Sequence, residues 1–149
     1  MKCFTTFYLF LTLLLPIAVA NADAPNDKEF FNSNPDSPFP FSEAVRVDNT
    51  YYLSGQIGIV PGTPKLAEGG IEAEAAQTLN NIKATLKANG LGMRDVVKCT
   101  VMLADIADWP AFNKVYMTYF EKPYPARSAF ASSGLALGAA VEVECIAAK

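Results

Sequence analysis

The order of its helical and strand-like patterns restricts this chain more than any other feature. Apolar residues recur at helical spacing over 71–86, ahead of the helix-ending pair Asn89-Gly90. They recur again over 112–120, where Asp108 is placed to cap a helix and Pro110 lies in its first turn. Strand-like runs stand before, between and after these helices. They cover residues 44–47, 50–57, 96–103, 127–131 and 140–148.

This order predicts one α/β (α+β) domain, in which helical crossovers join the strands of a mixed sheet and both helices lie on one face. The other face needs a cover too, because the 96–103 run has apolar side chains at both odd and even positions and the 141–146 run is similar. The sequence shows no pattern for a third layer. We therefore expect a second copy of the chain to cover this face, in a homo-oligomer.

The first 22 residues have the layout of a secretory signal peptide. Lys2 is their single charge, an apolar run covers 4–19, and small residues allow cleavage after Ala20 or Ala22. An uncleaved membrane anchor is the alternative, but the run is short for a span of about 20 residues. We expect 1–22 to be removed, 23–40 to form an extended leader and 41–149 to form the domain. The mature protein would be periplasmic or secreted, without a stable membrane anchor.

Composition excludes several kinds of chemistry. The chain has no histidine, so it lacks the commonest metal ligand and the commonest general base, and we expect no metal site. Without Lys2, 11 basic residues face 15 acidic ones, a net charge of 11 − 15 = −4. There is no basic cluster. Nucleic acid and anionic membranes are therefore poor candidates as partners.

Two cysteines follow the predicted signal peptide, Cys99 and Cys145. Both lie in the middle of strand-like runs and alternate with apolar residues, as core positions do. Nothing in the sequence indicates that the two strands are neighbours with matched register, which a disulfide requires. We expect two buried, reduced thiols. The alternative is that export to an oxidising compartment allows a disulfide between two distant strands.

Two charged residues lie where a charge is costly. Arg127 follows Pro125-Ala126 at the start of a strand-like run, and Glu142 lies inside the apolar run 139–146. A charge in such a setting needs a partner or a function. Either Arg127 forms a structural ion pair with Glu142 or Glu144, or these charged residues belong to a functional site.

Five short blocks extend this interpretation. They are Phe41-Ser42-Glu43-Ala44, Leu53-Ser54-Gly55-Gln56-Ile57, Phe112-Asn113-Lys114-Val115-Tyr116, Pro125-Ala126-Arg127-Ser128 and Val141-Glu142-Val143-Glu144-Cys145-Ile146-Ala147. In order and spacing these blocks resemble the reactive intermediate deaminase (RidA, YjgF-like) family, over roughly residues 39–148.

The resemblance implies a chorismate-mutase-like fold, a homotrimer with clefts between its subunits, and no cofactor. It also implies hydrolysis of reactive enamines and imines, of the 2-iminobutanoate/2-iminopropanoate type, to 2-oxo acids and ammonia. In that family's pattern Arg127 grips the substrate carboxylate, which its planar guanidinium suits, and Glu142 orients the attacking water. The further substrate-binding positions are Asn113, Ser54, Gly55 and Phe41.

Two positions depart from the family pattern. Phe41 stands where a tyrosine is common, and Ala129 stands where a cysteine is common two residues after the arginine. Both changes bear on substrate range or rate. They leave room for a second hypothesis, a trimeric binding protein that holds 2-oxo acids or related carboxylates in the Arg127 clefts without turnover.

Overall fold

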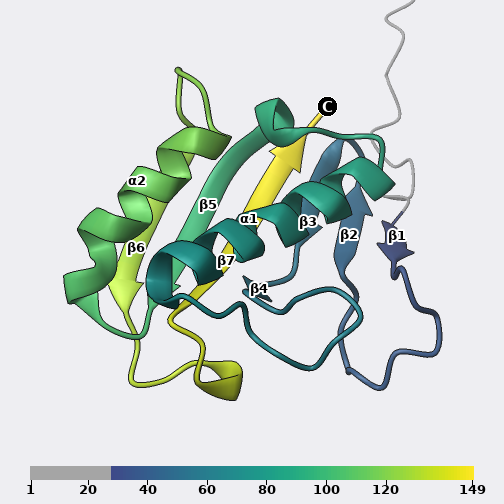
Figure 1. Ribbon diagram of the computed structural model, residues 1–149. Helices are drawn as coiled ribbons and strands as arrows, with labels where there is room; N and C mark the ends of the chain where they lie inside the picture. The colour runs from purple at the N-terminus through teal and green to yellow at the C-terminus, as the bar shows by residue number, and fades with distance from the viewer. Residues whose placement is uncertain (1–27) are drawn as a thin grey trace, which may run out of the picture.

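The computed structural model describes residues 28–149 (Figure 1). The predicted signal peptide and residues 23–27 of the predicted leader lie outside the described residues. The strands are β1 (Lys28–Phe31), β2 (Ala44–Val47), β3 (Thr50–Leu53), β4 (Gln56–Ile57), β5 (Val96–Leu103), β6 (Ala126–Ala131) and β7 (Val141–Ala148). The helices are α1 (Gly70–Ala88) and α2 (Trp109–Tyr119), with short 3₁₀ turns at Met93–Asp95, Ile106–Asp108 and Ala136–Gly138.

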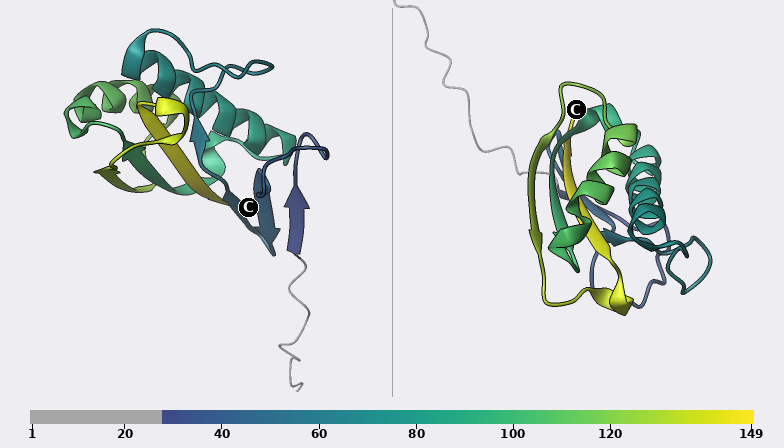
Figure 2. Two further views of the ribbon diagram at one scale, coloured as in Figure 1. Left: turned by 90° about the horizontal axis from the view of Figure 1, so that it is seen from below. Right: turned by 60° about the vertical axis from the view of Figure 1, so that its left-hand side comes forward.

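The strands form one mixed sheet in the order β1-β2-β3-β7-β5-β6, with β4 also paired to β7. β5 and β6 are parallel, and α2 makes the crossover that a parallel pair requires. Both helices lie on the same face of the sheet, as the edge-on view in Figure 2 shows. The predicted mixed sheet with two helices on one face is confirmed.

Both predicted helices form, with one difference at a cap. α1 ends at Ala88, and Gly90 follows with a φ of 71°, a left-handed conformation that suits glycine. α2 begins with Pro110 in its first turn, but Asp108 accepts no hydrogen bond from the helix. Instead the carboxylate of Asp105 accepts the Ala107 N–H at 2.9 Å and caps the preceding 3₁₀ turn. The proposed capping role of Asp108 is therefore wrong, because an extra turn precedes the helix.

The predicted leader contains a strand that the sequence pattern did not indicate. β1 pairs antiparallel with β2 and extends the sheet at its edge. Phe31 packs against the core and its ring stacks 6.2 Å from that of Tyr51, while Phe30 on the opposite side is exposed. The Phe31 anchor, the pairing with β2 and the Glu29–Arg46 ion pair together hold this segment against the sheet.

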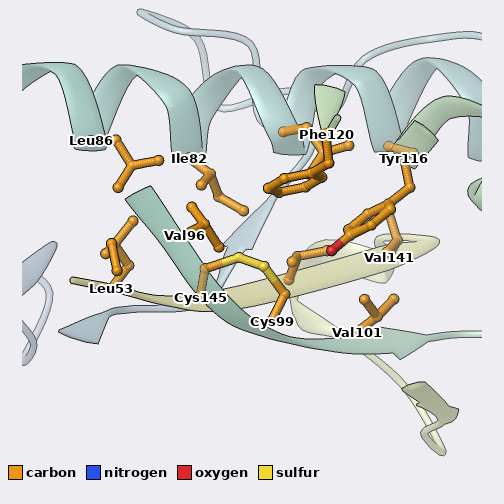
Figure 3. Close-up of a cluster of buried hydrophobic side chains, with 14 of the residues drawn as sticks. Leu53, Ile82, Leu86, Val96, Cys99, Val101, Tyr116, Phe120, Val141 and Cys145 are labelled. Atoms are coloured by element: carbon orange, nitrogen blue, oxygen red, sulfur yellow. A yellow bond between two sulfur atoms is a disulfide. The ribbon is translucent and has the colours of Figure 1, made fainter. Parts of the chain in front are cut away.

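The core fills the space between the sheet and the two helices (Figure 3). The apolar stripe of α1 packs onto alternate side chains of β5 and β7, while Phe112, Tyr116 and Phe120 of α2 complete the cluster. The fully or nearly fully buried strand residues include Val101, Leu103, Val141, Val143, Cys99 and Cys145. Within the described residues, no helix is long and apolar enough to cross a bilayer.

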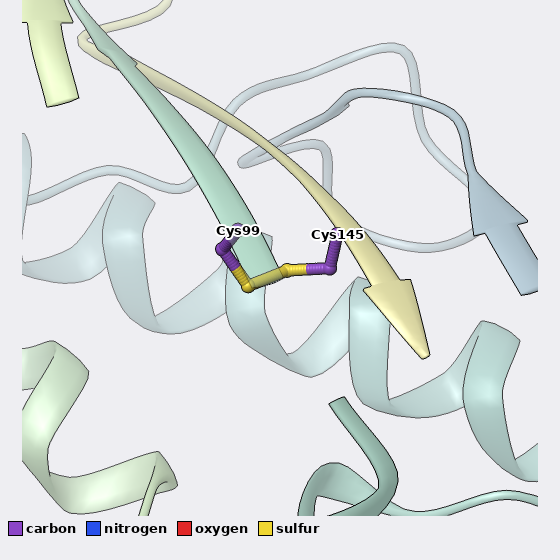
Figure 4. Close-up of a disulfide and its surroundings, with 2 residues drawn as sticks. All are labelled: Cys99 and Cys145. Atoms are coloured by element: carbon purple, nitrogen blue, oxygen red, sulfur yellow. A yellow bond between two sulfur atoms is a disulfide. The ribbon is translucent and has the colours of Figure 1, made fainter. Parts of the chain in front are cut away.

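Cys99 and Cys145 form a disulfide (Figure 4), so the prediction of two reduced thiols is wrong. β5 and β7 are antiparallel neighbours, and their register places Cys99 directly opposite Cys145, with the Cα atoms 4.1 Å apart. Both residues are buried, as expected. The sequence shows each strand but not their adjacency, because β6 and α2 separate them along the chain.

The face of the sheet opposite the helices is uncovered within residues 28–149. Strand alternation places on it the exposed aromatic residues Phe30, Tyr52 and Phe130. The face is more polar than the sequence indicated, since Lys98, Thr100, Glu142 and Glu144 also lie on it. The open face is therefore a mixed surface, on which aromatic and charged side chains lie together.

We predict that the protein, isolated from the cells that make it, has no free thiol at Cys99 or Cys145 when it is denatured without reductant and titrated with a thiol reagent. The disulfide closes a loop with a sequence separation of 46 residues. Loop-closure entropy gives a stabilisation of about 4 kcal/mol, so the Cys99→Ala/Cys145→Ala variant should unfold at clearly lower urea concentration. Finding two free thiols would instead restore the prediction made from the sequence.

Candidate functional site

Arg127 lies on the edge strand β6, on the face of the sheet that the helices cover. Its register partner is the buried Cys99, and its half-buried side chain extends under α2. The guanidinium carbon Cζ lies 4.7 Å from the centroid of the Tyr116 ring, 5.8 Å from Trp109 and 5.9 Å from Phe112. Three aromatic rings of one helix therefore attract the Arg127 charge.

No acidic side chain among residues 28–149 pairs with Arg127. The ion pairs in this part of the chain are Arg46–Glu29 and Arg94–Asp95. The structural pairing of Arg127 with Glu142 or Glu144 is therefore wrong, because both glutamates lie on the opposite face of the sheet. An aromatic ring supplies no carboxylate oxygen, so the forked N–H donors of Arg127 remain available to an anionic ligand.

Asn113 lies on the same face of α2 as Trp109 and Tyr116, four residues after one and three before the other. The Asn113 Oδ1 and the Tyr116 hydroxyl are both buried and have no hydrogen-bond partner within the described chain. Burial raises the pKa of the Tyr116 phenol, and the positive charge of Arg127 offsets part of that rise. We call Trp109, Asn113, Tyr116 and Arg127 the arginine half-site.

Glu142 lies on β7 beside the Ser54-Gly55 corner that separates β3 from β4. Its neighbour across the β4–β7 pair is Ile57, and its carboxylate rests on Gly55. A Cβ atom built on Gly55 would lie 3.0 Å from Glu142 Cδ and closer still to Oε1. The carboxylate thus occupies space that any residue larger than glycine would take.

The corner also holds the segment that carries Phe41. Ser54 donates from its hydroxyl to the Ser42 carbonyl at 2.6 Å and from its backbone N–H to the Glu43 carbonyl at 3.0 Å. Phe41 is 53% exposed, and its ring stacks on Phe39 with centroids 5.5 Å apart. We call Phe41, Ser54, Gly55 and Glu142 the glutamate half-site.

One chain does not bring the two half-sites together. Cys99 and its partner Arg127 lie on the helix-covered face, whereas Met102 pairs with Glu142 on the open face. The structure thus groups the predicted site residues into two sets on opposite sides of β5. The sequence did not reveal the aromatic support of Arg127. The pattern that could have indicated this support is the helical spacing of Trp109, Phe112 and Tyr116, in the helix that precedes β6.

Two further features lie outside both half-sites. A surface cavity of about 710 Å³ opens between the α1–β5 and α2–β6 connections, lined among others by Leu91, Arg94, Glu121 and Lys122. None of the predicted site residues lines it. Residues 28–149 contain no cluster of three or more cysteine or acidic side chains that could hold a metal ion.

The fold and the half-sites define a small α+β domain with an arginine available to a carboxylate and a glutamate seated on a glycine corner. The family model described as endoribonuclease L-PSP matches residues 31–149. The chain therefore belongs to this family, which includes the RidA proteins.

Similar proteins cover most of the chain. It is 49% identical over 108 residues to 2-iminobutanoate/2-iminopropanoate deaminase of Capra hircus. The aligned residues make up 72% of this chain and 79% of that protein. It resembles the crystal structure of RidA from an Antarctic Psychrobacter species with a TM-score of 0.73 and 42% identity, over 77% of this chain and 93% of the other. It also resembles Escherichia coli TdcF with bound serine, with a TM-score of 0.75 and 28% identity, over 81% of this chain and 98% of that one.

Proposed function

We propose that this protein hydrolyses 2-iminobutanoate, 2-iminopropanoate and related reactive imines to 2-oxo acids and ammonia. The observation that carries the proposal is the state of Arg127, which is half-buried, surrounded by aromatic rings and free of any acidic partner within the described chain. Such a guanidinium suits the carboxylate that every 2-imino acid carries. The deaminase named above, at 49% identity, supports the same reaction.

The two half-sites would be joined by assembly. Because Arg127 and Glu142 face opposite sides of one sheet, a substrate in contact with both needs one residue from each of two chains. The uncovered face and the unpaired edge of β6 are the surfaces available for this contact. We infer a homotrimer, in which the arginine half-site of one subunit meets the glutamate half-site of the next and forms a cleft.

In the proposed reaction Arg127 binds the carboxylate of the imino acid, and an enamine first tautomerises to the imine. The Glu142 carboxylate accepts a hydrogen bond from a water molecule, whose oxygen adds to the imine carbon while the C=N π electrons move to nitrogen. One proton of the water passes by way of Glu142 to that nitrogen and gives a carbinolamine, which carries a hydroxyl and an amino group. The hydroxyl proton then passes by way of Glu142 to the amino nitrogen as the C=O bond forms and the C–N bond breaks, so that ammonia leaves and the 2-oxo acid remains.

This chemistry demands little acid–base power from the protein. A protonated imine carbon is already electrophilic, so holding the substrate on Arg127 and the water on Glu142 supplies most of what is needed, an effect of several kcal/mol. Phe41 offers no hydroxyl group, and Ala129 offers no thiol and packs against the core. We propose that both shape the cleft and that neither takes part in proton transfer.

We also propose that the protein is exported after cleavage of residues 1–22. Support comes from the signal-peptide layout of the sequence and from the Cys99–Cys145 disulfide, which is typical of proteins in oxidising compartments. The protein used for thiol counting also tests this, because its intact mass identifies the first residue. A chain that retains Met1 would contradict export by cleavage.

The first prediction from the proposed function concerns assembly. Light scattering of residues 23–149 at micromolar concentration should give three times the subunit mass, because the open face and the divided site both call for a partner. With a single-subunit mass, Arg127 and Glu142 would stay on opposite faces of one sheet and could not contact the same substrate. That result would therefore contradict both the trimer and the proposed site.

The second prediction concerns Arg127. Arg127→Ala should abolish imine hydrolysis and leave the trimer intact, and Arg127→Lys should recover little activity, because an ammonium group cannot form the two parallel hydrogen bonds. The imine is generated by an amino-acid oxidase, and semicarbazide competes for it as a trap. Arg94→Ala is the matched control, since the Arg94 side chain is 93% exposed and lies outside both half-sites.

The stability of Arg127→Ala separates function from structure. Loss of one partner of a buried ion pair would cost about 3–5 kcal/mol. Since Arg127 has no such partner in the described chain, a smaller loss is expected. A variant that melts much earlier but hydrolyses the imine at the normal rate once folded would show that Arg127 has only a structural role.

The third prediction concerns the glycine corner. Gly55→Ala should lower kcat by about 100-fold, because the new methyl group displaces the Glu142 carboxylate from its seat and a misplacement of about 1 Å can cost that much. The fold should survive, since the displaced atoms are the end of a flexible side chain. Gly134→Ala is the matched control, because a Cβ there meets no atom within 4 Å. Equal losses in both variants would remove Glu142 from the mechanism.

A further inference from the structure

We propose that Tyr116 is a positioning residue for Arg127, and that its aromatic ring rather than its hydroxyl group does this. This inference rests on the proposed function, because the task of Arg127 is taken to be binding the substrate carboxylate. Tyr116 would act through Arg127 and would not touch the reacting atoms. Trp109 would assist from a greater distance.

The position of Arg127 requires such support. Its long side chain starts from the edge strand β6 and is only half-buried. Without a contact that fixes it, such a side chain would sample several rotamers. Ion pairing is the usual way to hold an arginine, but no acidic group among residues 28–149 pairs with it. The nearest aromatic ring is that of Tyr116, at 4.7 Å from Cζ, more than 1 Å closer than the other two.

The Tyr116 ring is itself held firmly. Only 4% of the residue is exposed, and the centroid of its ring lies 5.7 Å from that of Phe112 and 4.4 Å from that of Phe120. Figure 3 shows Phe120 beside Tyr116 in the core. A ring packed this closely in the core has little freedom to move. A guanidinium that rests on a fixed ring is preorganised for its ligand, and preorganisation improves binding by reducing the entropy lost in the complex.

An aromatic support suits this task better than an acidic one. A carboxylate would occupy the forked N–H donors of Arg127 and neutralise its charge, so the substrate would have to displace it. A ring attracts the cation through its π electrons and leaves both the net charge and the donors for the ligand. The aromatic support therefore leaves Arg127 able to bind a carboxylate without first releasing an acidic partner.

The hydroxyl group of Tyr116 does not explain the contact. It is buried and has no hydrogen-bond partner within residues 28–149. Its removal therefore leaves no other buried group unsatisfied. This observation assigns the positioning effect to the ring and makes phenylalanine the conservative replacement.

The experiment compares Tyr116→Leu, Tyr116→Phe and Leu86→Ala in the assembled full-length mature protein. For each we would measure kcat and KM with the oxidase-generated imine, and the Kd of the product 2-oxobutanoate by calorimetry. Tyr116→Leu should raise KM and Kd by about tenfold, in line with a partly desolvated cation–π contact, and change kcat by less than about twofold. Tyr116→Phe should restore both constants to within about twofold of the original protein.

Leu86→Ala is the matched control for damage to the core. Leu86 of α1 is fully buried, and Figure 3 shows it at the other end of the core from Tyr116. Its melting temperature should fall about as much as that of Tyr116→Leu, while KM and Kd stay close to the original values. If Tyr116→Leu fails to fold, Trp109→Leu replaces it, with an expected rise in KM and Kd of about threefold because that ring is farther away.

The outcomes are distinct. Unchanged KM and Kd in Tyr116→Leu, or an equal rise in Leu86→Ala, would overturn the positioning role. A large fall in kcat for Tyr116→Phe would overturn the assignment to the ring and point to the hydroxyl group. If the original protein binds 2-oxobutanoate without hydrolysing imines, the proposed function fails and the Kd series alone decides on Tyr116. If it does neither, both proposals fail.

Discussion

The register of β5 between its two neighbours determines on which face of the sheet Arg127 and Glu142 lie. Cys99 is the partner of Cys145 on one side and of Arg127 on the other, while Met102 is the partner of both Glu142 and Phe130. Cys99 and Met102 are three residues apart on β5, and side chains alternate along a strand, so their partners lie on opposite faces. Arg127 therefore lies under the helices and Glu142 on the open face. A slip of one residue would exchange the faces and expose the core. The disulfide links β5 to β7 at Cys99, the residue that is also the register partner of Arg127.

The elements of the domain were predictable from the sequence because each has a strong local pattern. The stripe over 71–86, the glycine after it, the proline at the start of α2 and the runs at 96–103 and 140–148 all depend on nearby residues. What could not be predicted depends on contacts between distant segments. The Cys99–Cys145 bond needs the strand order, and β1 needs the edge of β2 against which Phe31 packs.

The candidate site shows the same division between local and distant information. The family-like blocks marked Arg127, Glu142, Ser54 and Gly55, and the seat of Glu142 on Gly55 agrees with that grouping. The pairing of Arg127 with a glutamate was a reasonable physical alternative, since a half-buried charge needs compensation. The structure provides that compensation in another form, through the rings of α2. A sequence pattern identifies charged residues more readily than it identifies the neutral groups that stabilise them.

The departures from the family pattern fall on groups that the proposed reaction can do without. Phe41 lacks a hydroxyl group and Ala129 lacks a thiol, whereas Arg127 and Glu142, to which the proposal assigns carboxylate binding and the orientation of water, are both present. Addition of water to a protonated imine depends more on orientation than on a strong base. A chain without histidine is therefore suited to this reaction so long as Arg127 is held in place. That placement depends on α2, whose crossover position follows from the parallel pairing of β5 with β6. The packing of one helix against one edge strand thus connects the fold to the chemistry.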